Sequence, residues 1–269
     1  KISNIFMKFQ GVIRKMQSEF KSPIKYYMEF DNDFICLNDL LDKEVSIKFL
    51  HYFCLSCEKE KEIFRQGYCK NCFFEQPQAG DWIIKPELST AHLNIEDRDL
   101  DYEKSVQLQP HIVYLANTGQ IKVGVTRKGQ VPYRWIDQGA HQAIELVEVP
   151  NRFLAGITEV AIKEFISDKT NWRKMLTNDS NELDIMSCKE DIKKHIPIET
   201  LDYYIQNNSK TDIDFPVNEY PIKPLTQKLI KTKEIKGTLK GIKGQYLIFE
   251  ENKVFNVRSH EGFVVEVSF

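Results

Sequence analysis

The feature that most constrains this chain is a pattern of four cysteines, CLSC and CKNC, spaced C-x2-C-x11-C-x2-C. They are Cys54, Cys57, Cys69 and Cys72. Tetrahedral zinc takes four soft ligands, and two CxxC turns supply two thiolates each. The intervening EKEKEIFRQGY can form a short hairpin, with Gly67 at the turn into the second pair. The pattern therefore predicts a structural zinc ribbon over 51–75, a closed site that serves folding or docking rather than chemistry.

Two alternatives for the four cysteines are disulfides and a redox-active CxxC. A cytoplasmic compartment argues against disulfides, and a redox motif needs only one pair in a thioredoxin-like βαβ context. The two other cysteines, Cys36 and Cys188, stand among apolar residues, and we expect them to be buried small side chains.

Composition and charge exclude several classes of protein. Apolar residues make up 42% and charged residues 28% of 269, as in an ordinary globular protein. No run of about 18 apolar residues is present, which predicts no membrane span, and the first residues lack the features of a signal peptide. Met7 is a candidate natural start. We therefore expect a cytoplasmic protein.

The net charge of −2 gives no global attraction to nucleic acid, but the charge is unevenly distributed. Residues 104–136 carry five basic residues and no acid, and residues 223–243 carry seven lysines against Glu234 alone. Basic stripes of this kind pair with phosphates. For 223–243, a solvated lysine-rich face is an equal alternative.

The hydrophobic pattern predicts an α+β protein built from several parts. We expect antiparallel β units at 1–50 and 223–269. Three arrangements stay open for them: two related barrels, one sheet built from both termini, or two unrelated β meanders. Between them we expect the zinc ribbon, a surface connection at 76–109, an α+β domain with trailing helices at 110–206, and a linker at 207–222. A helix begins after Asn151, a good N-cap residue, and two more helical stretches cover 182–195 and 198–206.

The stretch HIVYLANTGQIKVGVTRKGQVPYRWIDQGA, residues 111–140, reads as a polar hairpin that leads to a third strand and a helix containing AGITEVAIKEFI. This order resembles the GIY-YIG nuclease domain over roughly 110–175. Tyr114 matches the first tyrosine of that family, Gly124 the glycine, Arg134 the arginine and Glu159 the helix glutamate. The departure is KVG in place of YIG, which puts Lys122 where the second tyrosine stands.

A second resemblance extends over nearly the whole chain. FQGVIRKM, QGYCKNC, KPEL, PYRWIDQGA, DKTNWRKML and GIKGQYLIF are similar to a bacterial family called domain of unknown function 2797. That family carries no assigned activity.

The nuclease resemblance implies a reaction. Glu159 would hold Mg²⁺ or Mn²⁺, and the metal would stabilise the leaving oxyanion. Tyr114 would orient or deprotonate water, and Lys122 and Arg134 would have to lower its pKa for it to act as a base at neutral pH. Arg134 would contact phosphate in a bidentate fashion, and Lys122 would grip the backbone as a point charge. Five further residues are candidates for substrate binding: Gly124, Thr126, Arg127, Gln138 and His141.

Each of these residues also has a purely structural interpretation, such as a strand tyrosine, a close-packing glycine or a solvated helix glutamate. Two functions therefore stay open at this point. The chain is a zinc-containing, metal-dependent nuclease acting on DNA or RNA, or an inactive nuclease scaffold that binds nucleic acid or protein.

Overall fold

The computed structural model describes residues 7–30, 33–178 and 183–269. It confirms the mixed α+β class and divides the chain into two compact units. Unit 1 comprises Lys1–Phe74 and Asp214–Phe269, and unit 2 comprises Glu75–Ile213. The unit boundary therefore falls inside the expected linker at 207–222.

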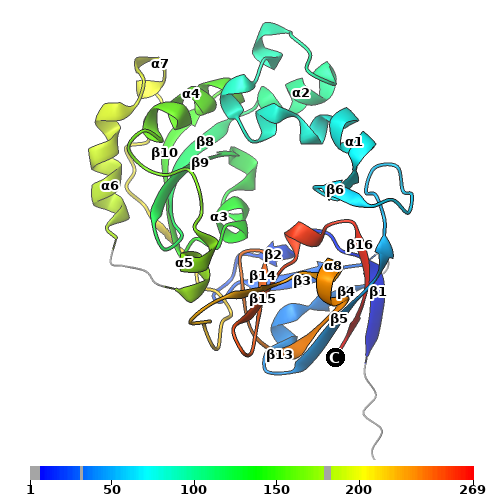
Figure 1. Ribbon diagram of the computed structural model, residues 1–269. Helices are drawn as coiled ribbons and strands as arrows, with labels where there is room; N and C mark the ends of the chain where they lie inside the picture. Colours follow the sequence, from blue (N-terminus) through cyan, green and yellow to red (C-terminus); the bar gives the residue numbers. More distant parts are fainter. Residues whose placement is uncertain (1–6, 31–32, 179–182) are drawn as a thin grey trace, which may run out of the picture. The chain divides into compact units, whose positions relative to one another are not determined.

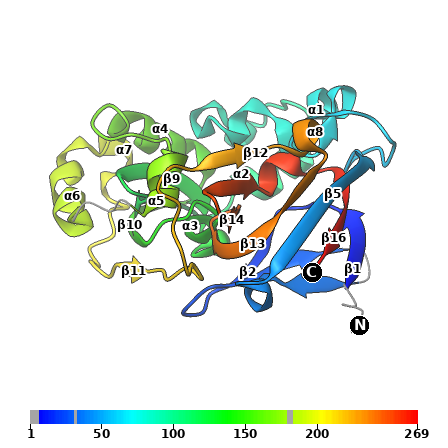
Figure 2. The same cartoon turned by 60° about the horizontal axis from the view of Figure 1, so that its bottom comes forward.

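A seven-stranded sheet forms the centre of unit 1, with strand order β1-β16-β5-β13-β14-β15-β12 (Figures 1 and 2). Its strands are β1 (Lys8–Val12), β5 (Glu44–Tyr52), β12 (Leu225–Gln227), β13 (Glu234–Lys243), β14 (Tyr246–Phe249), β15 (Lys253–Asn256) and β16 (Phe263–Ser268). All neighbours are antiparallel except β12 and β15. β16 lies between β1 and β5, so the two ends of the chain build one sheet. Of the three arrangements that the sequence left open, the structure shows one sheet built from both termini.

Smaller elements complete unit 1. β2 (Gln17–Glu19), β3 (Lys25–Glu29) and β4 (Phe34–Cys36) form an antiparallel sheet, followed by a 3-10 turn at Leu37–Leu40. The ribbon consists of β6 (Ile63–Arg65), β7 (Tyr68–Cys69) and α1 (Lys70–Glu75). α8 (Leu229–Thr232) precedes β13, and a 3-10 turn at Arg258–His260 precedes β16.

Unit 2 is built on a four-stranded antiparallel sheet with the order β11-β10-β8-β9. The strands are β8 (His111–Asn117), β9 (Ile121–Arg127), β10 (Gln142–Val149) and β11 (Thr211–Asp212). Buried residues of β8, β9 and β10, among them Val113 and Val123, pack with α4 (Arg152–Ile162) and α6 (Ile185–Ile192). Asn151 caps α4 as predicted, because its side chain accepts the Leu154 N–H at 3.0 Å.

Two helices of unit 2, α6 and α7 (Ile198–Leu201), are shorter than the stretches predicted over 182–195 and 198–206, and a 3-10 turn at Lys193–His195 follows α6. The sequence did not predict α5 (Trp172–Thr177). Of the stretch expected to be helical over 182–195, residue 182 lies outside the described residues. The sequence did not predict α3 (Tyr133–Asp137), which lies on the other side of the sheet from α6 in Figure 1.

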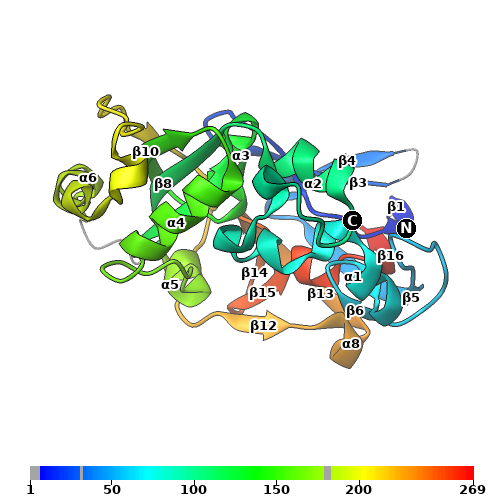
Figure 3. The same cartoon turned by 90° about the horizontal axis from the view of Figure 1, so that it is seen from above.

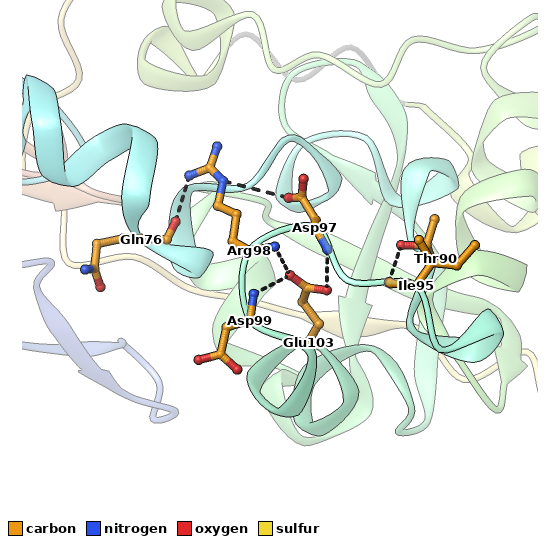
Figure 4. A network of polar contacts seen from close by, with 7 residues as sticks. All are labelled: Gln76, Thr90, Ile95, Asp97, Arg98, Asp99 and Glu103. Carbon is orange, nitrogen blue, oxygen red and sulfur yellow. Dashed lines mark hydrogen bonds and ion pairs between the residues drawn. The ribbon is translucent and has the colours of Figure 1, made fainter.

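The connection over 76–109 is ordered, which corrects the expectation of a surface loop. It forms 3-10 turns at Pro77–Ala79, Asp81–Ile83, Pro86–Leu88 and Ala91–Leu93, then α2 (Leu100–Gln107). The Glu103 carboxylate is fully buried and accepts the N–H groups of Asp97, Arg98 and Asp99 at 3.0, 2.7 and 3.0 Å (Figure 4). A buried carboxylate of this kind satisfies backbone groups that no helix or sheet pairs.

The same segment packs against α4, as Figure 3 shows. A side chain at Gly156 would collide with the backbone of Pro86 and Glu87, so only glycine allows this approach. The segment therefore belongs to the core of unit 2 although it contains few apolar residues. Within the described part of the chain, no helix is long and apolar enough to cross a membrane.

Candidate metal centre and candidate active site

The four ribbon cysteines converge. The Sγ atoms of Cys54, Cys57, Cys69 and Cys72 all lie within 4.8 Å of one another. Tetrahedral zinc with Zn–S bonds of about 2.3 Å requires S···S separations of roughly 3.8 Å, so a small contraction completes the site. Among the described residues, this is the one group of three or more His, Cys, Asp or Glu side chains placed to hold a metal.

Local backbone geometry places the thiols. Gln66 and Gly67 both have positive φ, at 53° and 76°, and turn β6 into β7 as the sequence predicted. The chain then enters α1, which carries Cys72 one turn beyond Cys69. The N–H of Cys69 donates to the Cys54 sulfur at 3.2 Å, and Ile63 packs against the cluster.

The pKa values of the clustered thiols indicate that the four sulfurs need a cation at their centre to be thiolates together. Burial raises the pKa of Cys54, but hydrogen bonds from the backbone N–H groups of Cys69, Cys57 and Ser56 have a larger combined effect. Together they lower the pKa of Cys54 to about 6. The Ser56 hydroxyl lowers the pKa of Cys72, but burial and the three other thiols raise it to about 11. Four crowded sulfurs cannot all be thiolates without a neutralising charge, and a divalent metal supplies it. The residues therefore fit zinc, whereas Cys36 and Cys188 lie apart and half-buried.

The second site lies on the β8–β9 hairpin of unit 2. Tyr114 faces Gly124 directly across the two strands. A Cβ atom on Gly124 would stand 2.6 Å from the Tyr114 hydroxyl oxygen, so the ring lies over the glycine. The hydroxyl donates to Gln138 Oε1 at 3.0 Å, and Trp135 meets the ring edge-on at 5.9 Å.

Burial controls the pKa of Tyr114. The residue is completely buried, and this burial raises its pKa although Arg134 and Gln138 act to lower it. The lowered pKa that base catalysis by Tyr114 requires is therefore not found, because the loss of hydration outweighs the neighbouring positive charge. With this pKa and a hydrogen bond to Gln138, Tyr114 is a poor base in this arrangement.

Lys122 and Glu159 lie close enough to influence each other's pKa. Burial lowers the pKa of Lys122 to about 8, with Arg134 adding to the effect. Its Nζ donates to the backbone oxygen of Asp168 at 3.2 Å. Burial raises the pKa of Glu159 to about 7, and Asp168 raises it further while nearby cations lower it. Both groups therefore titrate close to neutral pH, which is a property of functional sites.

The Glu159 carboxylate has charged neighbours but no ion pair within 4.0 Å among the described residues. Lys163, one turn further along the helix, pairs instead with Glu87 at 3.9 Å. A half-buried carboxylate without a direct partner is chemically suited to take one position on a divalent cation, with water and substrate in the others.

Sequence reasoning missed Arg152, the first residue of α4. Its guanidinium is buried, donates to the backbone oxygens of Trp82 and Ile83 at 3.1 and 2.7 Å, and acts electrostatically on Glu159. A signal was available, because a cation in the first turn of a helix opposes the helix dipole and needs another reason to be there.

The other sequence-predicted binding residues occupy different places. Thr126 is buried and donates to Gln130 at 3.2 Å. Arg127 ends β9 and contributes charge near Arg152. His141 lies beyond the Asn117 end of β8 and lines a cavity of about 580 Å³ with Asp184 and Asp212. The structure thus gathers Tyr114, Lys122, Arg134, Glu159 and Gln138 around Gly124, and leaves His141 outside this group.

Comparison with known proteins supplies one finding. Residues 42–265 match the family described as Protein of unknown function (DUF2797). The chain belongs to the DUF2797 family. The matched range includes the cysteine cluster, the β8–β9 hairpin and α4, so both candidate sites of this DUF2797 protein lie inside the family region. Neither the curated proteins nor the solved structures provide a match.

Proposed function

We propose that this DUF2797 protein is a metal-dependent phosphodiesterase that acts on nucleic acid, with a GIY-YIG-like site in unit 2 and a structural zinc in unit 1. The observation that supports the proposal is that Arg134 and Glu159 both act on the charge of Lys122 and both act on Tyr114. A buried lysine and a half-buried carboxylate with pKa values of about 8 and about 7 are available for proton transfer and metal binding at neutral pH.

Each residue has a distinct role in this proposal. Arg134 binds a phosphate oxygen pair through its planar guanidinium. Lys122, in the place of the second motif tyrosine, is neutral in an appreciable fraction near pH 8 and accepts the proton of the attacking water. Tyr114 acts as a positioning residue that holds Gln138 through its hydroxyl, rather than acting as the base.

Glu159 is the proposed holder of Mg²⁺ or Mn²⁺. When bound, such an ion stabilises negative charge on the leaving oxygen of a phosphodiester. Arg152 acts as a positioning residue: it ties the 82–83 backbone to the start of α4 and thereby fixes the helix that carries Glu159.

The experiment compares the parent protein with Glu159→Gln and with Glu164→Gln, an exposed glutamate two residues beyond α4. Both substitutions remove one carboxylate charge without a change of shape. Labelled single- and double-stranded DNA and RNA are incubated with Mg²⁺ or Mn²⁺. We expect cleavage by the parent and Glu164→Gln and a loss of at least a hundredfold in Glu159→Gln. Equal cleavage by all three proteins, or none by any, would exclude this site.

The burial of Tyr114 and the lysine at the second motif position favour a second candidate function, an inactive scaffold that binds nucleic acid. Under this alternative, no protein cleaves, but the parent binds oligonucleotides and the affinity falls with salt. Joint substitution of Lys122 and Arg127 by glutamine then weakens binding and flattens the salt dependence, whereas Glu159→Gln leaves affinity unchanged.

A further inference from the structure

Three phenylalanines and one arginine form a cluster on the zinc ribbon, in unit 1 and outside the site proposed above. Phe64 of β6 lies 5.3 Å from Phe73 and 5.9 Å from Phe74, both on α1, and these two lie 5.4 Å apart. The guanidinium of Arg65 lies 5.2 Å from the ring centre of Phe64 and 6.0 Å from that of Phe73. We refer to these four residues as the aromatic cluster.

The aromatic cluster faces solvent. Phe64 is 43% exposed and Phe74 is 58% exposed. Side chains alternate along a strand, and Ile63, next to Phe64, packs against the thiols. The ribbon core is therefore filled without Phe64 and Phe74. Gathered exposed rings of this kind mark an interaction surface, whereas isolated exposed apolar residues need no explanation.

The elements that form the aromatic cluster carry two exposed cations, Arg65 on β6 and Lys70 on α1. Acidic residues flank them, so the stretch 58–75 as a whole is neutral, with four acidic and four basic residues. The cation in contact with the rings is Arg65. A partner with flat apolar faces and an anionic group complements these rings and this guanidinium, and unpaired nucleotides combine both properties.

We propose that the aromatic cluster is a stacking platform for unpaired bases of single-stranded nucleic acid, with Arg65 and Lys70 against the phosphates. Bases stack on aromatic rings and on arginine planes without regard to sequence. A duplex keeps its bases stacked on each other, so the platform selects single strands. This is a binding site separate from the β8–β9 hairpin, and it holds whether or not unit 2 cleaves.

The metal controls the platform. α1 begins at Lys70, between Cys69 and Cys72, and carries Phe73 and Phe74 directly after the last ligand. Zinc held by the four cysteines would fix α1 against the β6–β7 hairpin and so hold these rings beside Phe64. We therefore expect the affinity for single strands to decrease when the zinc is removed.

The test is fluorescence anisotropy of a labelled short oligothymidylate, and of a duplex of equal length, with the full-length zinc-loaded protein and no added Mg²⁺ or Mn²⁺. The variants are Phe64→Ala and Phe74→Ala, and the control is Phe20→Ala. Phe20 is an equally exposed phenylalanine of unit 1, at 46%, outside the aromatic cluster. Arg65→Lys keeps the charge and removes the planar guanidinium.

We expect Phe64→Ala and Phe74→Ala each to raise the Kd for the single strand at least about fivefold, the lower bound for one lost stacking contact. We expect Arg65→Lys to raise it by a smaller factor and Phe20→Ala to leave it within twofold. The parent should bind the duplex more weakly than the single strand.

Equal effects of the Phe64, Phe74 and Phe20 variants, or equal affinity for single strand and duplex, would overturn the platform. Self-association of the chain that Phe64→Ala abolishes, without oligonucleotide binding, would also overturn it and assign the surface to a protein interface. Failure of the nuclease proposal is distinguishable, because the parent protein would then bind the single strand in the anisotropy assay without cleaving any substrate. The two assays use different variants in different units.

Discussion

The charge on Glu159 is expected to destabilise unit 2, and its removal should therefore stabilise the unit at high pH. Burial raises the pKa of Glu159 from 4.5 to about 7. Between these values, the folded protein keeps a proton that the unfolded chain has lost, so the free energy of unfolding falls as the pH rises. The shift in the pKa corresponds to a stabilisation of the folded protein of roughly 3 kcal/mol at low pH. This stabilisation is fully lost once the pH exceeds the folded-state pKa.

The glutamine in Glu159→Gln cannot ionise, so this variant does not lose stability through this position as the pH rises. Its stability relative to the parent should be close to unchanged at pH 4.5 and about 3 kcal/mol greater at pH 8. Glu164→Gln, which removes an exposed charge, should differ from the parent by less than about 0.5 kcal/mol at both pH values. Titrating groups that do not interact with Glu159 contribute equally to all three proteins and cancel in the difference. Lys122 does not cancel completely, because the Glu159 charge raises its pKa in the parent.

The assay is urea unfolding followed by tryptophan fluorescence without added divalent metal. All three tryptophans, Trp82, Trp135 and Trp172, belong to unit 2, so the signal reports that unit alone. A stability difference between Glu159→Gln and the parent that is the same at pH 4.5 and 8 would refute the reasoning. If Glu159 also binds Mg²⁺, adding Mg²⁺ at pH 8 stabilises the parent and leaves Glu159→Gln unchanged.

Three further outcomes follow from the packing and the metal centre. Gly124→Ala places a methyl group 2.6 Å from the Tyr114 hydroxyl and should destabilise unit 2 by about 1–3 kcal/mol in urea unfolding. The purified protein should contain one zinc per chain by mass spectrometry, and Cys72→Ser should lose most of it because a tetrahedral site loses one of four ligands. Glu103→Gln replaces the carboxylate that accepts three backbone N–H groups and should cost about 1–3 kcal/mol in the tryptophan-monitored assay.

Each of these outcomes has a control in the same chain. Gly129→Ala meets nothing within 4 Å and should leave stability near that of the parent, so equal losses at both glycines would argue against the Tyr114 contact. Cys36→Ser should keep its zinc, and equal zinc loss in both cysteine variants would argue against the four-thiol site. For Glu103, the exposed Glu164→Gln is the comparison, and an equal effect would place the buried network in doubt.

Several features of this protein follow from the sequence alone because they depend on neighbours in the chain. The spacing of the four cysteines predicted their convergence, since each CxxC turn brings two thiols together and one hairpin joins the turns. Asn151 predicted the start of α4 because an N-cap acts within three residues. The β8–β9 hairpin also follows from two strand-like segments and the short turn between them, whereas the register that places Tyr114 opposite Gly124 comes from the structure.

The tertiary structure alone decided which distant segments meet. β16 pairs with β1 and β5 in one sheet, and an alternating strand pattern does not specify its partner. The 76–109 segment is ordered by the buried Glu103 carboxylate and by Arg152, whose partners are backbone groups that leave no trace in composition.

The same holds for the chemistry of the candidate active site. Base catalysis by Tyr114 would require neighbouring positive charge to lower its pKa, yet complete burial raises it. Burial also moves the pKa values of Lys122 and Glu159 towards neutral pH. A sequence shows which charges are present, but the pKa of each group depends on how much water the fold removes from it.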